Sequence, residues 1–461
     1  ELVRDRVPLH GKVASHGAAF NSPAGRTRSL LVRGAGVERL RPLRTIAVNG
    51  DSLQAEAPAF HICLLDLLNR HGGRQVHRLG DRAAEERLRG GHPWIFRSDV
   101  EHRPSTLAGI VPIEGPDGAP LGFALWSPLS EISLRRIETD LSRTPDATWW
   151  HEKLRTAIAR RALLASDANA YRLVHGEGDG LPSLVVDKYG DVLVVQLLSA
   201  GVDAWTDTIV SSLVELTQCT GILARNDPAA RGREGLPREV KLLYGEVPRT
   251  VEVVEHGVRY LAAPWDGQKT GAFLDQRENR VLIGSLARGQ ALDCFAYHGS
   301  FALHLAKKAD KVFALDVSAP ALARVHEHAE RNGLTNIEPV EGDAFDVLRA
   351  WYREGRRFDT IVVDPPAFAK TKSAIDGALR GYKDINLQAM RLLAPGGLLF
   401  TASCSFHLSR GHFFEMLQDA SADSGRAFAL RAITGQPLDH PELITVPETG
   451  YLKGALLEAM S

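Results

Sequence analysis

A series of short apolar segments, each ending at or just before an aspartate, occupies residues 287–405 and constrains the fold more than any other feature. Asp293 and Asp316 end the first two segments, Asp343 follows the third, and Asp364 follows the fourth. The segments alternate with stretches of helical periodicity, which predicts a parallel sheet in an α/β fold. Because ligands bind beyond the carboxyl ends of strands in such sheets, we expect the four carboxylates to converge on one crevice.

Turn and capping residues divide this region into regular elements. A helix is expected from Ser300, and a second one after Ser318, a residue type favoured at N-caps, with Pro320 in its first turn and Gly333 at its end. The Pro395-Gly396-Gly397 tripeptide is expected to separate a later helix from the fifth strand. The five strands are expected to end at Asp293 and to cover residues 311–315, 337–340, 360–363 and 398–401.

The number of glycines in the turn after the first strand distinguishes a dinucleotide site from a site for a smaller ligand. A dinucleotide-binding turn carries three glycines, whereas Gly299 is alone here, which disfavours a dehydrogenase. Asp316 follows Asp293 at close to the spacing of about 20 residues that is typical of a ribose-binding acid. This order of signals resembles the class I S-adenosylmethionine (AdoMet) methyltransferases. The resemblance implies that the turn after Asp293 backs the methionine part, that Asp316 binds the ribose hydroxyls, and that Asp343 binds the adenine amino group.

Composition limits the compartment and the partners. The chain has 461 residues, 44% of them hydrophobic, and a net charge of −1, so it is long enough for two to four domains and carries no overall charge signal for nucleic acid. Its four cysteines form no C-x-x-C pair, which argues against a disulfide framework and a structural zinc site, and no metal is expected. We find no secretory signal and no apolar run of about 18 residues, so we expect a cytoplasmic protein without a membrane span.

The chain divides into four parts. Residues 1–71 lack sustained periodicity and are left unassigned, with a disordered extension as one option. Residues 72–145 are expected to form a small β-rich domain, and residues 146–262 a middle α+β domain with a helix from Trp149 to about Ser166 and a hairpin over 184–197. Residues 263–461 are expected to form the Rossmann-like methyltransferase domain.

The run Gly91-His92-Pro93-Trp94 resembles the start of a PUA domain, an RNA-binding pseudobarrel. A cluster of arginines near it suits phosphate contact. The alternative is a solvated face, because Asp81, Glu85 and Glu86 are interleaved with these arginines. The cluster consists of Arg74, Arg78, Arg82, Arg87, Arg89 and Arg97.

Residues 266–280 combine polar, aromatic and glycine residues in a way that is unusual for a linker. We interpret this segment as a lip over the carboxylate and amine of AdoMet, with Lys269 or Arg277 meeting the carboxylate. A helix N-terminus with solvated charges is the alternative. The full set of candidate AdoMet-binding residues is Lys269, Thr270, Phe273, Gln276, Arg277, Asp293, Phe295, Gly299, Asp316, Ser318 and Asp343.

The residues after Asp364 bear on the nucleophile. Enzymes that methylate an exocyclic amine commonly place an aromatic residue directly after Asp-Pro-Pro, and here Ala367 stands there. Carbon 5 of cytosine needs covalent activation, which one cysteine and one carboxyl across a flat pocket can supply. Cys404, after the fifth strand, and Asp364 meet this need, although a buried core thiol is the alternative for Cys404. His407 could favour the thiolate, while Cys294 is expected in the core or in the cofactor lining.

From about residue 74 to its end, the chain resembles the PUA-containing large-subunit (23S) rRNA cytosine-5 methyltransferases. The resemblance implies Cys404 as the nucleophile, AdoMet as the methyl donor and rRNA as the substrate. Ala367 departs from the many RNA members that carry a second cysteine at that position, so release would need another base, such as water or Lys383; for Lys383, a helix-surface role is the alternative. The matching pieces include Lys269-Thr270-Gly271, Leu274-Asp275-Gln276-Arg277, Asp364-Pro365-Pro366, Ser403-Cys404-Ser405, Asp439-His440-Pro441 and Tyr451-Leu452-Lys453-Gly454.

Two other functions stay open at this point. A methyltransferase for a ring nitrogen, such as guanine N7, would use the same scaffold without needing Cys404. A non-catalytic RNA-binding protein would keep an AdoMet site as a relic. The oligomeric state is also open, with a homodimer among the options.

Overall fold

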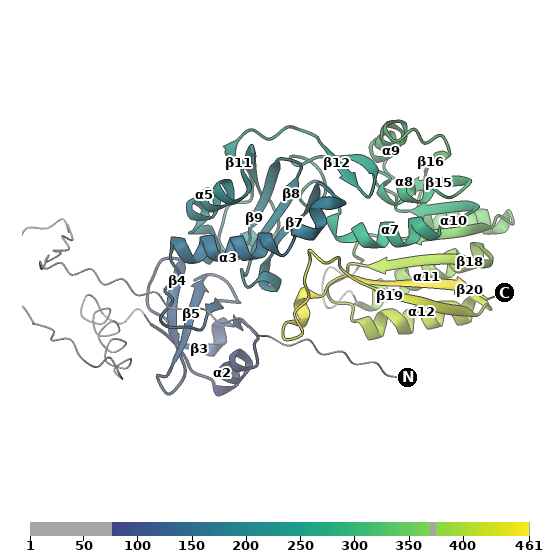
Figure 1. The fold of residues 1–461 in the computed structure, drawn as a ribbon. Coiled ribbons are helices and arrows are strands. Elements are labelled where there is room, and N and C mark those ends of the chain that lie inside the picture. The colour runs from purple at the N-terminus through teal and green to yellow at the C-terminus, as the bar shows by residue number, and fades with distance from the viewer. Residues whose placement is uncertain (1–75, 369–374, 461) are drawn as a thin grey trace, which may run out of the picture. The chain divides into compact units, whose positions relative to one another are not determined.

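The computed structural model describes residues 76–368 and 375–460, so residues 1–71 and Arg74 lie outside the described part of the chain. The described residues form sheets of six, five and seven strands and a two-stranded ribbon (Figure 1). The predicted combination of β-rich, middle α+β and Rossmann-like parts is confirmed.

The six-stranded sheet has the order β2-β6-β5-β4-β1-β3. Alternating apolar residues of its strands pack with Leu88 of α2 in one small core. Asp81 caps α2 by accepting a hydrogen bond from the Ala83 amide at 2.8 Å. The elements are β1 (His77–Leu79), α2 (Arg82–Arg89), β2 (Trp94–Ile95), β3 (Val100–His102), β4 (Gly109–Glu114), β5 (Pro120–Trp126) and β6 (Leu134–Glu138).

The five-stranded sheet has the order β11-β10-β9-β8-β7, and the predicted hairpin is confirmed as β8 and β9. The helix that was expected to run to Ser166 ends at Ala159. There the buried Arg161 side chain bonds Ala157 O at 3.1 Å and Asp179 at 2.6 Å, and a 3₁₀ turn, Ala162–Ser166, follows. The elements are α3 (Ala147–Ala159), β7 (Ala170–His175), β8 (Leu184–Tyr189), β9 (Val192–Leu197), α4 (Ala200–Asp203), α5 (Thr206–Thr217), β10 (Gly221–Asn226), α6 (Ala230–Arg233) and β11 (Glu239–Gly245).

The seven-stranded sheet has the order β16-β15-β14-β17-β18-β20-β19. The first five strands are parallel, and β20 runs antiparallel between β18 and β19. The ribbon β12 (Val251–Glu255) and β13 (Val258–Ala262) precedes it. The strands are β14 (Gln290–Cys294), β15 (Lys311–Asp316), β16 (Ile337–Glu341), β17 (Phe358–Val363), β18 (Leu393–Ser403), β19 (Phe428–Thr434) and β20 (Lys453–Ala459).

Both faces of this sheet are buried, as the continuous apolar runs predict. Ala291 packs in the core with α7, α8 and α9, whereas its neighbour Leu292 packs in the core with α10, α11 and α12. Figure 1 shows α12 below β18, β19 and β20 in this view. The helices are α7 (Arg277–Leu286), α8 (Ser300–Ala306), α9 (Ala319–Arg331), α10 (Ala344–Arg353), α11 (Ile375–Leu392) and α12 (Arg410–Ser424).

Two local predictions can be compared with the structure. Ser318 caps α9, and Gly333 has a φ of +64° just beyond its end, as expected. The fifth strand begins earlier than expected, at Leu393, because Pro395-Gly396-Gly397 bulges out between the pairs Phe358–Leu393 and Thr360–Leu398. The bulge shortens the regular pairing and leaves the carboxyl end of β18, which carries Cys404, where the sequence predicts it.

Candidate active site

A cavity of about 340 Å³ lies at the carboxyl ends of β14, β15, β17 and β18. The segment before α7 lines one side, and the loops after the strands line the other. The cavity brings together Lys269, Phe273, Gln276, Phe295, Asp316, Asp343, Asp364 and Cys404 among the predicted residues. It is also lined by residues that we did not predict, among them Asp275, Arg280, Tyr297, Ser300 and Leu452.

The turn after β14 folds around the carboxylate of Asp316. Asp316 Oδ2 accepts a hydrogen bond from the Tyr297 amide at 2.8 Å, and Oδ1 accepts one from the Ser318 amide at 2.9 Å. Phe295 and Tyr297 both have positive φ angles, +63° and +50°, which non-glycine residues rarely adopt. This strained backbone fixes the position of Asp316 at the cavity wall, and strain of this kind concentrates at functional sites.

Gly299 has a packing role in the same turn. Its φ is +86°, and a Cβ atom there would come within 3.0 Å of the Val325 side chain on α9. A side chain at this position would push the turn away from α9. Gly299 does not line the cavity, so its contribution to ligand binding is the course of the backbone.

Asp343 lines the cavity and also caps α10. Its Oδ1 accepts hydrogen bonds from the amides of Phe345 at 2.9 Å and Asp346 at 3.3 Å. The cap explains why an aspartate stands just after β16. The carboxylate is exposed and therefore accessible to a ligand.

The expected convergence of four strand-end acids is wrong for Asp293. Its side chain is buried and does not line the cavity, and its Oδ2 accepts a hydrogen bond from the Ala302 amide of α8 at 2.9 Å. Burial raises the pKa of Asp293 well above its usual range, and the charges of Asp364 and Asp316 act in the same direction. Asp293 therefore ties the end of β14 to α8.

Three further predicted residues do not line the cavity. Thr270 is buried, and its hydroxyl donates a hydrogen bond to Asp187 Oδ2 at 2.6 Å. The Ser318 side chain is the N-cap of α9 and accepts a hydrogen bond from the Ala321 amide. Arg277 is buried against Asp439, with 2.9 Å between Arg277 Nη2 and Asp439 Oδ1. Of the two cations proposed for a carboxylate ligand, only Lys269 lines the cavity.

Lys269 is held at the mouth of the cavity by a buried acid and two aromatic rings. Its ammonium is paired with Asp275 and lies 4.9 Å from the centroid of Phe273 and 5.8 Å from that of Tyr451. Tyr451 also donates to Asp275 Oδ2 at 2.9 Å. These contacts keep Asp275 ionised and hold its pKa far below the ordinary value despite burial.

Asp364 is oriented by the amide of Gln276. Asn279 Nδ2 donates to Gln276 Oε1 at 2.6 Å, which leaves Gln276 Nε2 to donate to Asp364 Oδ1 at 2.9 Å. Burial raises the pKa of Asp364 to about 7, the charge of Asp275 adds to the rise, and Lys269 opposes it. A carboxyl group with this pKa can donate or accept a proton near neutral pH.

Cys404 lies directly after β18 and is half-buried in the cavity wall. Burial raises the pKa of its thiol to about 11, and the charge of Asp364 contributes to the rise. The next residue, Ser405, is anchored by a 2.9 Å hydrogen bond between its Oγ and the Tyr382 hydroxyl. Cys404 and Asp364 thus line one cavity and are close enough to influence each other electrostatically.

Three residues considered near the chemistry lie elsewhere. Cys294 is fully buried in the core, which was one of its two expected positions. His407 packs against the Phe406 ring and does not line the cavity. Lys383 lies on the surface of α11, where its ammonium is 2.9 Å from Asp423 Oδ2 of α12.

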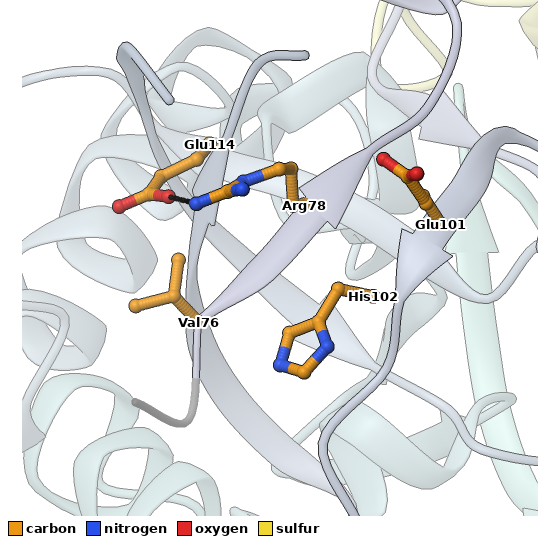
Figure 2. A pocket seen from close by; sticks show the side chains of 5 residues that line it. All are labelled: Val76, Arg78, Glu101, His102 and Glu114. Carbon is orange, nitrogen blue, oxygen red and sulfur yellow. Dashed lines mark hydrogen bonds and ion pairs between the residues drawn. The ribbon is translucent and has the colours of Figure 1, made fainter. Parts of the chain in front are cut away.

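A second hollow of about 370 Å³ lies in the six-stranded sheet, lined by Val76, Arg78, Glu101, His102 and Glu114 (Figure 2). Figure 2 shows the Arg78 guanidinium pointing to Glu114, with 3.3 Å between Nη2 and Oε2. Two carboxylates and one paired arginine do not form a phosphate site. We therefore place the chemistry in the cavity of the seven-stranded sheet.

Four of the arginines that were proposed for phosphate contact, Arg78, Arg87, Arg89 and Arg97, have partners inside the protein. Arg87 pairs with Asp99 at 2.5 Å, and Arg89 pairs with Glu85 at 2.5 Å. Arg97 donates to the Pro128 carbonyl at 2.9 Å. Of the three interleaved acids in the alternative interpretation, Glu85 pairs with one of these arginines, Arg89.

Two features are absent from the described residues. No helix within them has the length and apolar content needed to cross a membrane. No group of three or more His, Cys, Asp or Glu side chains within them is arranged to hold a metal ion.

The residues of the main cavity fit AdoMet. Two backbone amides orient the carboxylate of Asp316, which can accept hydrogen bonds from the hydroxyl groups of a ribose. Lys269 supplies a cation for the carboxylate of the methionine part. Phe273, Phe295 and Tyr297 add aromatic surface. A doubly wound sheet with an antiparallel β20 and this cavity at its strand ends define a Rossmann-like AdoMet-dependent methyltransferase.

Comparisons with known proteins agree with this class. Residues 171–443 match the family described as S-adenosylmethionine-dependent methyltransferase, and residues 81–139 match the PUA-like domain. The ribosomal RNA large subunit methyltransferase I of Shewanella amazonensis is 40% identical over 379 residues, which cover 80% of this chain and 96% of that protein. The protein of the same name from Aeromonas hydrophila is 38% identical, covering 82% of this chain and 98% of that protein.

A solved structure supports the fold. A candidate methyltransferase in complex with SAH superposes with a TM-score of 0.72 at 22% identity, covering 83% of this chain and 99% of that chain. The chain belongs to the ribosomal RNA large subunit methyltransferase I family, with a PUA-like domain before the AdoMet-dependent methyltransferase part.

Proposed function

We propose that this protein methylates carbon 5 of a cytosine in large-subunit rRNA, with Cys404 as the nucleophile and Asp364 as the acid. The observation that carries the proposal is that a thiol and a carboxyl with a pKa of about 7 line the same cavity as the predicted AdoMet-binding residues. The names of the relatives, which are methyltransferases of large-subunit ribosomal RNA, support the substrate class.

The chemistry explains why both groups are needed. Carbon 5 of cytosine is a poor nucleophile because the ring withdraws electrons. The Cys404 thiolate adds to carbon 6, a sulfur–carbon bond forms, and the displaced electron pair reaches N3, which takes the proton of Asp364. Carbon 5 then has the character of an enamine carbon. Gln276 holds Asp364 Oδ1, which directs the other carboxyl oxygen to this task.

When bound, AdoMet supplies the electrophilic methyl group that carbon 5 takes. Asp316 is proposed to hold its ribose hydroxyls, Asp343 its adenine amino group and Lys269 its carboxylate. The proton on carbon 5 is then lost, the sulfur–carbon bond breaks, and N3 returns its proton to Asp364. Water is the proposed base, because Lys383 is engaged with Asp423 on the surface and Ala367 has no titratable side chain.

The RNA must present an unstacked base to reach the cavity. Enzymes that act on a base within a helix extrude it, and sequence-specific RNA recognition favours single-stranded loops. We propose that the PUA-like part contributes to RNA binding by shape, since much of its arginine charge is paired within the protein.

The test is nucleoside mass spectrometry of large-subunit rRNA fragments after incubation with enzyme and AdoMet. We expect 5-methylcytidine with the wild type and none with Cys404→Ala, while calorimetry shows unchanged AdoMet binding. Cys219→Ala, at a buried cysteine between α5 and β10, is the matched control and should retain activity. Formation of 7-methylguanosine, or of 5-methylcytidine by Cys404→Ala, would contradict the proposal.

A further inference from the structure

A buried lysine that the proposed reaction does not use lies beside the Cys404 loop. Lys453 begins β20 with a relative exposure of 3%, and the antiparallel register places it opposite Ser403. Its Nζ donates to the Ser405 carbonyl at 2.7 Å and to the Tyr451 carbonyl at 2.8 Å. The lysine therefore contacts the residues on both sides of Cys404: it pairs with Ser403 in the sheet, and its ammonium bonds the carbonyl of Ser405.

Among the residues that the structure describes, the charge of Lys453 has no carboxylate partner. Buried charges in proteins are normally paired because isolating them from water is costly. Within residues 76–368 and 375–460, no acidic side chain forms an ion pair with Lys453, and its two hydrogen-bond acceptors are neutral carbonyls. An ammonium group has three N–H donors, so one remains for another acceptor.

The electrostatic surroundings of Lys453 point to Cys404. Burial lowers the pKa of Lys453 to about 8, and the negative charge of an ionised Cys404 is the largest opposing influence. Arg410 adds to the lowering, and Glu442 opposes it more weakly than Cys404 does. An anion on Cys404 would therefore compensate the buried ammonium.

Cys404 has the complementary need. The thiolate is the reactive form of a cysteine, yet burial and the charges of Asp364 and Asp275 disfavour it here, with Lys269 opposing them. Lys269 is largely committed to its ion pair with Asp275. A second cation beside Cys404 would favour the thiolate further.

We propose that Lys453 is a positioning residue whose ammonium group is the counterion of the Cys404 thiolate. The proposal rests on the proposed function only in that the thiolate is taken to attack carbon 6 of cytosine. When the thiol ionises, its proton leaves to solvent, and no bond forms between sulfur and nitrogen. When the sulfur bonds to carbon 6, its negative charge passes to the ring, and Lys453 keeps its two carbonyl partners.

The test is the pH dependence of Cys404 alkylation by iodoacetamide in the full-length protein without RNA, followed by mass spectrometry of the peptide that carries Cys404. Loss of an opposite charge at close range shifts a pKa by about 1–3 pH units, so Lys453→Met should raise the midpoint by about 1–2 pH units. Lys453→Gln, which keeps donors for the carbonyls but no charge, should do the same. Lys453→Arg should stay near the wild type.

Lys307→Met, which removes an exposed lysine that bonds the His256 carbonyl, is the matched control and should leave the midpoint unchanged. An unchanged midpoint in Lys453→Met or Lys453→Gln would overturn the proposal, as would an equal rise in Lys453→Arg, since the charge would then not matter. Because alkylation needs no RNA, a raised midpoint in an enzyme that makes no 5-methylcytidine would refute the proposed function alone. An unchanged midpoint in an active enzyme would refute this inference alone.

Discussion

Replacement of the catalytic acid should stabilise the protein while abolishing its activity. The pKa of Asp364 is about 7 in the folded chain, against an ordinary value of 3.8. The folded protein thus holds this proton more tightly than the unfolded chain does. Ionisation of Asp364 therefore penalises the folded state, increasingly as the pH rises from about 4 to about 7, and fully above that.

The size of the penalty follows from the difference between the two pKa values. About three pH units at 1.36 kcal/mol each give an upper bound of about 4 kcal/mol. Since the Asp364 side chain is only partly buried, water in the cavity reduces this, and we expect about 2 kcal/mol at pH 8. Asp364→Asn removes the ionisation but keeps an acceptor for Gln276, so it should be more stable than the wild type by about this amount.

The measurement is urea unfolding of both proteins at about pH 5 and about pH 8, followed by tryptophan fluorescence, since Trp351 lies in the methyltransferase core. The advantage of Asp364→Asn should be larger at the higher pH by about 1–2 kcal/mol. Asp310→Asn, at an exposed aspartate, is the control and should show no such trend. An advantage of Asp364→Asn that is absent, or equal at both pH values, would refute the assigned environment of Asp364.

Three further predictions concern other parts of the site. Gln276→Met should lower kcat about 10–100-fold, because a hydrogen bond to a charged group contributes about 1.5–3 kcal/mol, with AdoMet affinity nearly unchanged; a change confined to AdoMet binding in steady-state kinetics would instead make Gln276 a cofactor ligand. Asp316→Asn should weaken AdoMet binding in calorimetry about 10-fold or more, through loss of charge-assisted hydrogen bonds, and an unchanged Kd would exclude the ribose assignment. Arg161→Met should destabilise the fold by about 3–5 kcal/mol, because it leaves the buried Asp179 without its main partner, whereas Arg160→Met, whose side chain is 55% exposed, should cost at most about 1 kcal/mol; equal losses in thermal unfolding would show that burial does not decide the effect.

The strand ends and caps could be predicted from the sequence because they depend on local patterns. Apolar runs ending at Asp316 and Asp364, and the helix start after Ser318, are read over a few residues. Once the sheet is parallel, its carboxyl edge gathers these positions without further information. That is why Asp364 and Cys404 were expected on one cavity.

The failures concern residues whose partners are distant in the sequence. From the sequence, Arg277 was a plausible cation for a carboxylate ligand. In the structure it pairs instead with Asp439, which is 162 residues away in the sequence. Asp293 lies at the end of a strand as Asp316 does, yet its carboxylate is buried and accepts a hydrogen bond from the Ala302 amide of α8. Lys453 was noted only as part of the Tyr451-Leu452-Lys453-Gly454 motif, because it is the pairing of β20 with β18 that places it beside Cys404.

The central claim is a sulfur–carbon bond between Cys404 and carbon 6 of the substrate base. RNA that contains 5-fluorocytidine at the modified position should trap it, since fluorine cannot leave as the proton does. With AdoMet present, denaturing electrophoresis and mass spectrometry should find RNA joined to the peptide that carries Cys404, and no such product with Cys404→Ala. A trapped product joined to another residue, or methylation of unsubstituted RNA with no trapped product from the fluorinated RNA, would contradict the claim.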